Sequence, residues 1–147
     1  MSEAILSGSC LCGQVKYSCT EPPVFTLYCH CTQCRKAHAA PYCAEAAMPA
    51  DSIKVEGKLK EIATPIEDGT RYHRFFCPEC GSHILGQSEN FPERTMLKIA
   101  TLDDPESVKP EAHVFTASEI SWSTFAEGQP RFEQMRPKNW TGDDSAD

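Results

Sequence analysis

The spacing of the cysteines is the feature that most restricts what this chain can fold into. Seven of its nine cysteines fall into three short groups, Cys10-x-Cys12, Cys29-x-Cys31-x-x-Cys34 and Cys77-x-x-Cys80. Thiolates at such spacing can reach one metal ion, with Zn–S bonds of about 2.3 Å. The total is odd and the first residues do not resemble a signal peptide, so disulfides are not expected. Metal binding or thiol chemistry is expected instead.

The first and last groups together predict one closed metal site. A Cys-x-Cys pair on extended backbone places both side chains on one face, about 6.6 Å apart along the strand. In the sequence CPECG (77–81), a tight turn points amide N–H groups at the sulfurs, and Gly81 supplies the unusual backbone geometry. Neither pair closes a site alone, but both pairs together make the four-thiolate set of structural zinc. The alternative is that these cysteines are small core residues.

That pairing leaves Cys29, Cys31 and Cys34 with no fourth cysteine nearby. Three protein ligands and one free position are typical of a catalytic zinc site. Two alternatives stay open, which are closure by His38 from the next helical turn and a reactive thiol cluster without metal. His30 is a poor fourth ligand, because a residue between two ligands on a strand faces the other way. An iron–sulfur cluster fits three cysteines less well than zinc does.

The remaining cysteines and histidines have no partner at ligand spacing. Cys19 and Cys43 lie in strand-like runs and are interpreted as buried, small apolar residues. His73, His83 and His113 are expected to be ordinary hydrogen-bonded histidines.

The charge of the chain argues against a role in binding nucleic acid. The formal net charge is −7, and the sequence has no basic stripe that would neutralise phosphates. No run approaches the roughly 18 apolar residues of a membrane span. We therefore expect a cytoplasmic protein with neither a nucleic-acid nor a membrane partner, and the oligomeric state stays open. Arg35 and Lys36 form a small basic patch. Two interpretations are open, which are that it binds substrate carboxylates and that it is ordinary solvent-exposed charge.

Alternating apolar residues and frequent prolines predict a mostly β, largely antiparallel domain. The expected strands lie near residues 14–20, 24–28, 42–48, 53–55, 59–64, 70–76, 82–87, 95–101 and 112–116. Asp68-Gly69 predicts a hairpin turn, because it supports the positive φ angles that tight hairpins need. One short helix is expected over 32–39, with Thr32 as its N-cap. We expect a single zinc-binding β domain over 1–127 and an irregular C-terminal arm over 128–147.

Three motifs in order resemble the glutathione-dependent formaldehyde-activating enzyme family. They are SGSCLCGQVKY (7–17), CHCTQCRK (29–36) and FFCPECGSHI (75–84), followed by AHVF (112–115) and SW (121–122). The resemblance implies a β-tent fold of stacked antiparallel sheets and two zinc ions per chain. The structural zinc it implies is held by Cys10, Cys12, Cys77 and Cys80, and the catalytic-type zinc by Cys29, Cys31 and Cys34.

The activity that the resemblance implies is reversible addition of formaldehyde to the thiol of glutathione, which gives S-hydroxymethylglutathione. Our first functional hypothesis is therefore a zinc-dependent carbon–sulfur lyase acting on glutathione, or a related thiol, and a small aldehyde. The alternative is a non-catalytic zinc-binding module or zinc chaperone with a labile three-cysteine site. A redox thiol protein that uses the same three cysteines is a third hypothesis.

Overall fold

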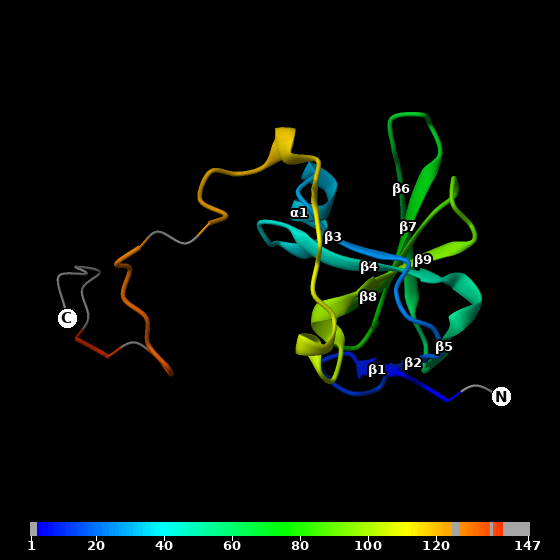
Figure 1. The fold of residues 1–147 in the computed structure, drawn as a ribbon, viewed down its shortest axis with the longest axis horizontal. Helices are drawn as coiled ribbons and strands as arrows, with labels where there is room; N and C mark the ends of the chain where they lie inside the picture. Colours follow the sequence, from blue (N-terminus) through cyan, green and yellow to red (C-terminus); the bar gives the residue numbers. More distant parts are fainter. Residues whose placement is uncertain (1–2, 125–126, 136, 140–147) are drawn as a thin grey trace.

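The computed structural model describes residues 3–124, 127–135 and 137–139, which form two β-sheets and one α-helix (Figure 1). The strands are β1 (Leu6–Ser9), β2 (Lys16–Cys19), β3 (Phe25–Cys29), β4 (Cys43–Pro49), β5 (Ile53–Glu56), β6 (Lys60–Pro65), β7 (Arg71–Phe76), β8 (His83–Ser88), β9 (Arg94–Lys98) and β10 (His113–Val114). The helix α1 spans Thr32–His38, and 3-10 turns occupy Ala50–Ser52, Ile99–Thr101, Pro105–Ser107 and Thr116–Ser118. The smaller sheet has the order β1-β2-β5, and the larger has the order β10-β3-β4-β9-β8-β7-β6.

The predicted fold class is confirmed, because the described chain is mostly β and every expected strand overlaps an observed one. Among the described strands the pairing is antiparallel except between β10 and β3. The strand expected near 95–101 ends at Lys98, where the chain enters a 3-10 turn. β1 was not expected, because its sequence LSGS has no alternation of apolar residues.

The main hydrophobic core lies between the two sheets. β2 contributes Tyr17 and Cys19, and β4 contributes Ala46 and Met48, each with 3% or less of its surface exposed. The other buried core residues are Cys10, Val15, Cys77, Ile84, Leu85, Leu97, Ile99 and Leu102. Full burial of a side chain such as Met48 contributes about 1.5–3 kcal/mol. Two of the predicted metal-binding cysteines are therefore part of the core itself.

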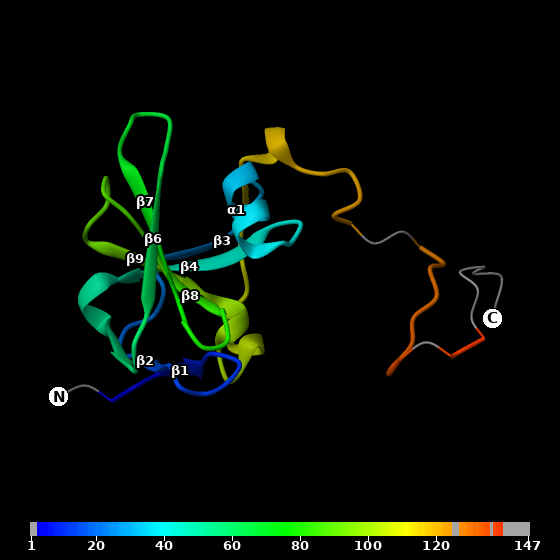
Figure 2. The ribbon, with the colours of Figure 1, turned by 180° about the vertical axis from the view of Figure 1, so that it is seen from behind.

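The helix α1 lies over the other face of the larger sheet. Figures 1 and 2 show α1 on one side of β3 and β4 and the smaller sheet on the other side. The expected N-cap at Thr32 is wrong, because Cys31 caps the helix and its Sγ accepts the Cys34 N–H at 3.3 Å. The Gln33 side chain donates to the Pro65 carbonyl oxygen at 2.9 Å, which fixes α1 to the end of β6.

The segment after the last 3-10 turn forms no helix or strand in its described residues, 119–124, 127–135 and 137–139. Figure 1 shows its orange part lying away from both sheets. The division into a domain over 1–127 and an arm over 128–147 stays a prediction, and residues 125–126, 136 and 140–147 lie outside the described residues. Within the described chain, no helix has the length and apolar character needed to cross a membrane.

A glycine in β8 makes room for an aromatic side chain of β7. A Cβ atom at Gly86 would collide with the Tyr72 ring and its hydroxyl group. The space lets the Tyr72 hydroxyl oxygen accept a hydrogen bond from Lys98 Nζ at 3.3 Å. Lys98 also forms a buried ion pair with Glu45, its direct partner across β9 and β4. Glycine weakens a strand interior, but here it brings a phenol to a buried charge.

Replacing Gly86 with alanine should lower the free energy of unfolding by about 1–3 kcal/mol, because the new methyl group overpacks the space against Tyr72. Urea unfolding measures this loss. In a Tyr72→Ala background the same substitution should cost much less, since the ring is gone. An equal cost in both backgrounds would contradict the contact.

Candidate metal centres

Four sulfurs meet where the β1–β2 turn approaches the β7–β8 turn. The Sγ of Cys12 lies 3.6 Å from that of Cys10 and 3.8 Å from that of Cys77. These three and the Sγ of Cys80 all lie within 4.8 Å of one another. A tetrahedral ion with Zn–S bonds of about 2.3 Å separates its sulfurs by about 3.8 Å. The cluster therefore has the dimensions of a four-thiolate zinc site.

Hydrogen-bond donors contact two of these four sulfurs, those of Cys10 and Cys80. The Val15 N–H donates to the Cys10 Sγ at 3.3 Å, and the Ser82 hydroxyl lies 3.3 Å from the Cys80 Sγ. Hydrogen bonds from Ser82 lower the pKa of Cys80 to about 5. The Leu11 N–H donates to Ser82 Oγ at 3.0 Å and so joins the two turns directly. Donors of this kind stabilise thiolates and orient them toward an ion.

Three further sulfurs gather at the end of β3 and the start of α1. Cys29 is the last residue of β3, Cys31 caps α1, and Cys34 lies in the first part of that helix. Their Sγ atoms lie within 4.8 Å of one another. Cys29 and Cys34 are buried, whereas Cys31 is partly exposed. A strand that leads directly into a helix is sufficient to bring these three thiols together.

Hydrogen bonds among the three thiols shift their pKa values in opposite directions, and this arrangement favours a bound cation. Hydrogen bonds from Cys29 and then from Cys34 lower the pKa of Cys31 to about 2. Hydrogen bonding with Cys29 and then with Cys31 raises the pKa of Cys34 far above its ordinary value. Two thiols can stabilise one thiolate, but three thiolates at this distance need a cation. Thiolates are ligands that zinc binds readily, so the residues fit such an ion.

No fourth side chain closes this group in the part of the chain that the structure describes. His30 faces away, as the strand geometry predicts, and its Nε2 lies 2.9 Å from the Nδ1 of His113. The His38 ring packs edge-on against His83, with ring centroids 4.7 Å apart, and does not join the sulfurs. Closure by His38 is therefore not supported.

Comparison with known proteins agrees with both cysteine groups. The sequence profile of the glutathione-dependent formaldehyde-activating enzyme family matches residues 5–118, which contain all seven of these cysteines. The chain belongs to this family. The resemblance of the three sequence motifs is thereby confirmed, and membership associates the chain with formaldehyde activation by glutathione. The two cysteine groups of this family member are compatible with zinc.

A solved structure also shares the fold of this chain. It is the crystal structure of a Rhodobacter sphaeroides protein, 20% identical in sequence, with a TM-score of 0.56. The match covers 74% of this chain and 99% of the other, and at this identity it supports the fold alone. No curated protein matches the sequence.

Beneath α1 the family member has a buried polar layer that the cysteine spacing did not predict. Lys98 and Glu45 are each 4% exposed and form an ion pair. The Cys43 thiol donates to Glu45 Oε1 at 3.5 Å and packs with Cys29 and Cys34, so the expected burial of Cys43 is confirmed. A buried ion pair is costly to break by removal of one partner. The sequence analysis missed this layer, and its one local signal is a glutamate inside the apolar run CAEAAM (43–48).

A groove of about 330 Å³ runs beside the C-terminal half of α1. Its lining residues are Arg35, Lys36, Ala39, Ala40, Pro41, Ile120 and Trp122. Two cations and an indole that is 69% exposed meet here, and none of the lining residues is acidic. Such a lining favours an anionic organic ligand, because cations attract carboxylates and the indole offers an apolar face.

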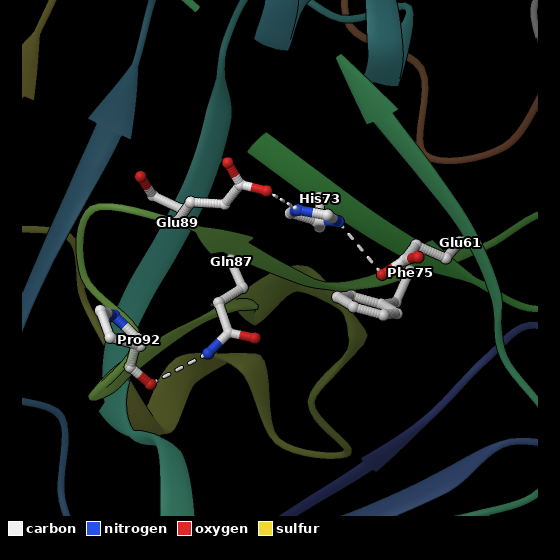
Figure 3. A pocket seen from close by; sticks show the side chains of 7 residues that line it. Glu61, His73, Phe75, Gln87, Glu89 and Pro92 are labelled. Atoms are coloured by element: carbon white, nitrogen blue, oxygen red, sulfur yellow. Dashed lines mark hydrogen bonds and ion pairs between the residues drawn. The ribbon is translucent and has the colours of Figure 1, made fainter. Parts of the chain in front are cut away.

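A second groove, of about 350 Å³, has a histidine between two carboxylates (Figure 3). The His73 Nε2 lies 2.9 Å from Glu89 Oε2, and its Nδ1 lies 3.2 Å from Glu61 Oε1. These hydrogen bonds, first the one with Glu89, raise the pKa of His73. Both ring nitrogens are therefore occupied, and the expectation of ordinary hydrogen-bonded histidines is confirmed for His73 and for His113.

Replacing Cys77 with alanine should remove one bound zinc and lower the free energy of unfolding by about 4 kcal/mol or more, because loss of a structural metal is among the largest mutational effects. Cys19→Ala is the matched control, since both cysteines are fully buried and Cys19 is outside the metal clusters. The control should keep both zinc ions and lose much less stability. Metal analysis and urea unfolding measure both effects, and equal losses would contradict the four-cysteine site.

The stabilising effect of His73 should depend on pH. A raised histidine pKa stabilises the fold below the unfolded value of about 6.5 and loses this effect as the pH rises through the folded pKa. His73→Gln should therefore reduce stability more at pH 5.5 than at pH 9, as measured by urea unfolding. In a Glu61→Gln, Glu89→Gln background this difference should disappear. A pH-independent effect in the otherwise unaltered protein would refute the pairing.

Proposed function

We propose that the protein is a zinc-dependent carbon–sulfur lyase that forms or breaks S-hydroxymethylglutathione or a related thiol–aldehyde adduct. The observation that carries the proposal is the group of Cys29, Cys31 and Cys34, which has no fourth ligand among the described residues. The family match over residues 5–118 supports the same class of reaction. A second, structural zinc at Cys10, Cys12, Cys77 and Cys80 completes the proposal of two ions per chain.

In this proposal Cys29, Cys31 and Cys34 would hold a zinc ion. The ion would supply Lewis-acid chemistry that lowers the pKa of a substrate thiol. The substrate sulfur adds to the aldehyde carbon, so a C–S bond forms and the C=O π electrons move to the oxygen. The oxygen then takes up the proton that the thiol released. The reverse reaction breaks the same C–S bond and returns the aldehyde.

The groove beside α1 suits the peptide part of glutathione. Arg35 and Lys36 offer positive charges to its carboxylates, and Trp122 offers an apolar face. Because Arg35 follows Cys34 directly, a tripeptide is long enough to place its thiol at the cysteines and a carboxylate in the groove. We further propose a cytoplasmic location, where glutathione keeps thiols reduced.

A non-catalytic zinc module or zinc chaperone is the second candidate. Cys31 is partly exposed, which would allow exchange of an ion with solvent as a labile site requires. Formaldehyde adds to thiols without an enzyme, so simple binding can resemble weak catalysis. Only a rate measurement separates these two functions.

Exchange NMR of formaldehyde, glutathione and their adduct provides that measurement. The unaltered protein should contain two zinc ions and accelerate exchange by about tenfold or more, which corresponds to a barrier lowered by about 1.4 kcal/mol. Cys31→Ser should keep one zinc ion and leave exchange at the uncatalysed rate. Cys43→Ala is the matched control, because this buried thiol neighbours Cys29 but lies outside the three-sulfur group. It should keep both ions and most of the activity.

Two bound zinc ions with no acceleration at any protein concentration would exclude the lyase for this substrate. That outcome would favour the zinc-binding module. Equal acceleration by the unaltered protein and Cys31→Ser would show that the three-cysteine centre does not carry the reaction.

A further inference from the structure

Arg74 of β7 is a buried cation that has no anionic partner among the residues that the structure describes. It is 4% exposed, and its Nη1 donates to the neutral hydroxyl of Thr64 at 2.9 Å. Its guanidinium carbon lies 4.8 Å from the centre of the Tyr72 ring. The Nε atom is buried and has no hydrogen-bond partner among the described residues. Buried arginines are rarely left in this state, because an unpaired buried charge is expensive.

The neighbouring charges do not compensate for Arg74. Among the described residues, the buried charged side chains are Glu45, Lys98 and Arg74. Glu45 is already paired with Lys98, which leaves one positive charge in excess. Thiolates of the three-cysteine group can balance this excess positive charge at a distance. They do not provide a hydrogen-bond acceptor for the Nε–H of Arg74. An acceptor for that donor has to come from outside the described residues, as a water molecule or a ligand.

Two histidines, whose rings lie 4.7 Å apart, are within reach of the charge of Arg74, and each has a free ring nitrogen. Burial, and to a smaller extent the charge of Arg74, lowers the pKa of both. The Nε2 of His38 and the Nδ1 of His83 are buried without a partner among the described residues. Both side chains are only half-buried, so solvent reaches their edges. Burial and then the charges of Lys98 and Arg74 lower the pKa of His83, which keeps it neutral. The expectation of an ordinary hydrogen-bonded histidine therefore does not fit His83.

This group is continuous with the three-cysteine centre. His38 lies one helical turn after Cys34, so both side chains are on the same face of α1. On the other side, Cys43 packs against Cys29 and Cys34, and its thiol donates a hydrogen bond to Glu45. Glu45 accepts a hydrogen bond from Lys98, which in turn donates to the Tyr72 hydroxyl. The Tyr72 ring packs against the Arg74 guanidinium. The free nitrogens and the three cysteines are thus joined by one chain of side-chain contacts beneath α1.

We propose that Arg74, His38 and His83 form an oxyanion subsite, which binds a negatively charged oxygen of the substrate. The identity of the ligand rests on the lyase function proposed above. When a thiolate adds to an aldehyde, negative charge develops on the aldehyde oxygen, and donors fixed at that position stabilise it. A carboxylate of the thiol substrate offers the same chemistry to the arginine. The proposal requires the two rings to rotate and give access to the guanidinium, a kind of side-chain change that is common on binding.

Formate tests the subsite without catalysis, because it is a small carboxylate. The ring signals of ¹³C-labelled histidine are followed by NMR as formate replaces chloride at constant ionic strength. Signals of His38 and His83 should shift and saturate in the unaltered protein and in Cys31→Ser, which excludes formate bound at the three-cysteine metal. Arg74→Gln should weaken binding by about tenfold or more, as expected for loss of a charge-assisted hydrogen bond.

Arg71→Gln is the matched control, since Arg71 lies on the same strand, is exposed, and donates to the Ala63 carbonyl oxygen. It should bind formate as the unaltered protein does. If Arg74→Gln does not fold, Arg74→Lys and His83→Gln replace it, and each should weaken binding. No saturable shift in the unaltered protein, or unchanged binding in the Arg74 variants, would overturn the subsite and assign the nitrogens to water.

The affinity for S-methylglutathione identifies which oxygen is bound, because this analogue keeps the carboxylates but lacks the aldehyde oxygen. Unchanged affinity in Arg74→Gln, together with slower exchange of formaldehyde, assigns the subsite to the aldehyde oxygen. Weaker affinity assigns it to a carboxylate. Either result supports the subsite. Formate binding without any lyase activity would overturn the proposed reaction and leave the subsite intact.

Discussion

The rest of this fold depends on the link between two distant turns. We propose that this link is a metal ion coordinated by the four-cysteine group. Cys12 and Cys77 are 65 residues apart, and their sulfurs lie 3.8 Å from each other. Closing so long a loop removes much of the entropy of the unfolded chain, and the binding free energy of a metal becomes folding free energy. Cys10 and Cys77 are also members of the main core. A metal bound by these cysteines would therefore hold the smaller sheet onto the larger one at the same place as the core packing does.

The two cysteine groups differ in what surrounds them. The four-cysteine group has a full set of sulfurs and hydrogen-bond donors from Val15 and Ser82. The three-cysteine group instead faces a polar layer in which Glu45 and Lys98 are buried. A layer of this kind is expensive to build in a protein interior. Its position beside an incomplete ligand set is consistent with a site that receives a substrate.

Local sequence signals predicted most of the fold, whereas the polar layer depends on contacts between distant strands. Gly81 and Gly69 have positive φ angles of 80° and 85°, as their turns require, and the cysteine groups follow from spacing alone. The N-cap was misplaced by one residue, because a cysteine sulfur took the role usually filled by an oxygen. The pairing of Glu45 with Lys98 required the register of β4 and β9, which short-range patterns do not contain.

The register of β4 links stability to chemistry. Ala46 and Met48 face the apolar core, whereas Cys43 and Glu45 face the side covered by α1. A slip of one residue against β9 would bury the glutamate in the core and turn methionine toward the cysteines. Both faces of this central strand are buried, so only the native register is tolerated. By fixing the sheets against each other, a metal bound at the distant four-cysteine group would also preserve the arrangement of charges around the three-cysteine group.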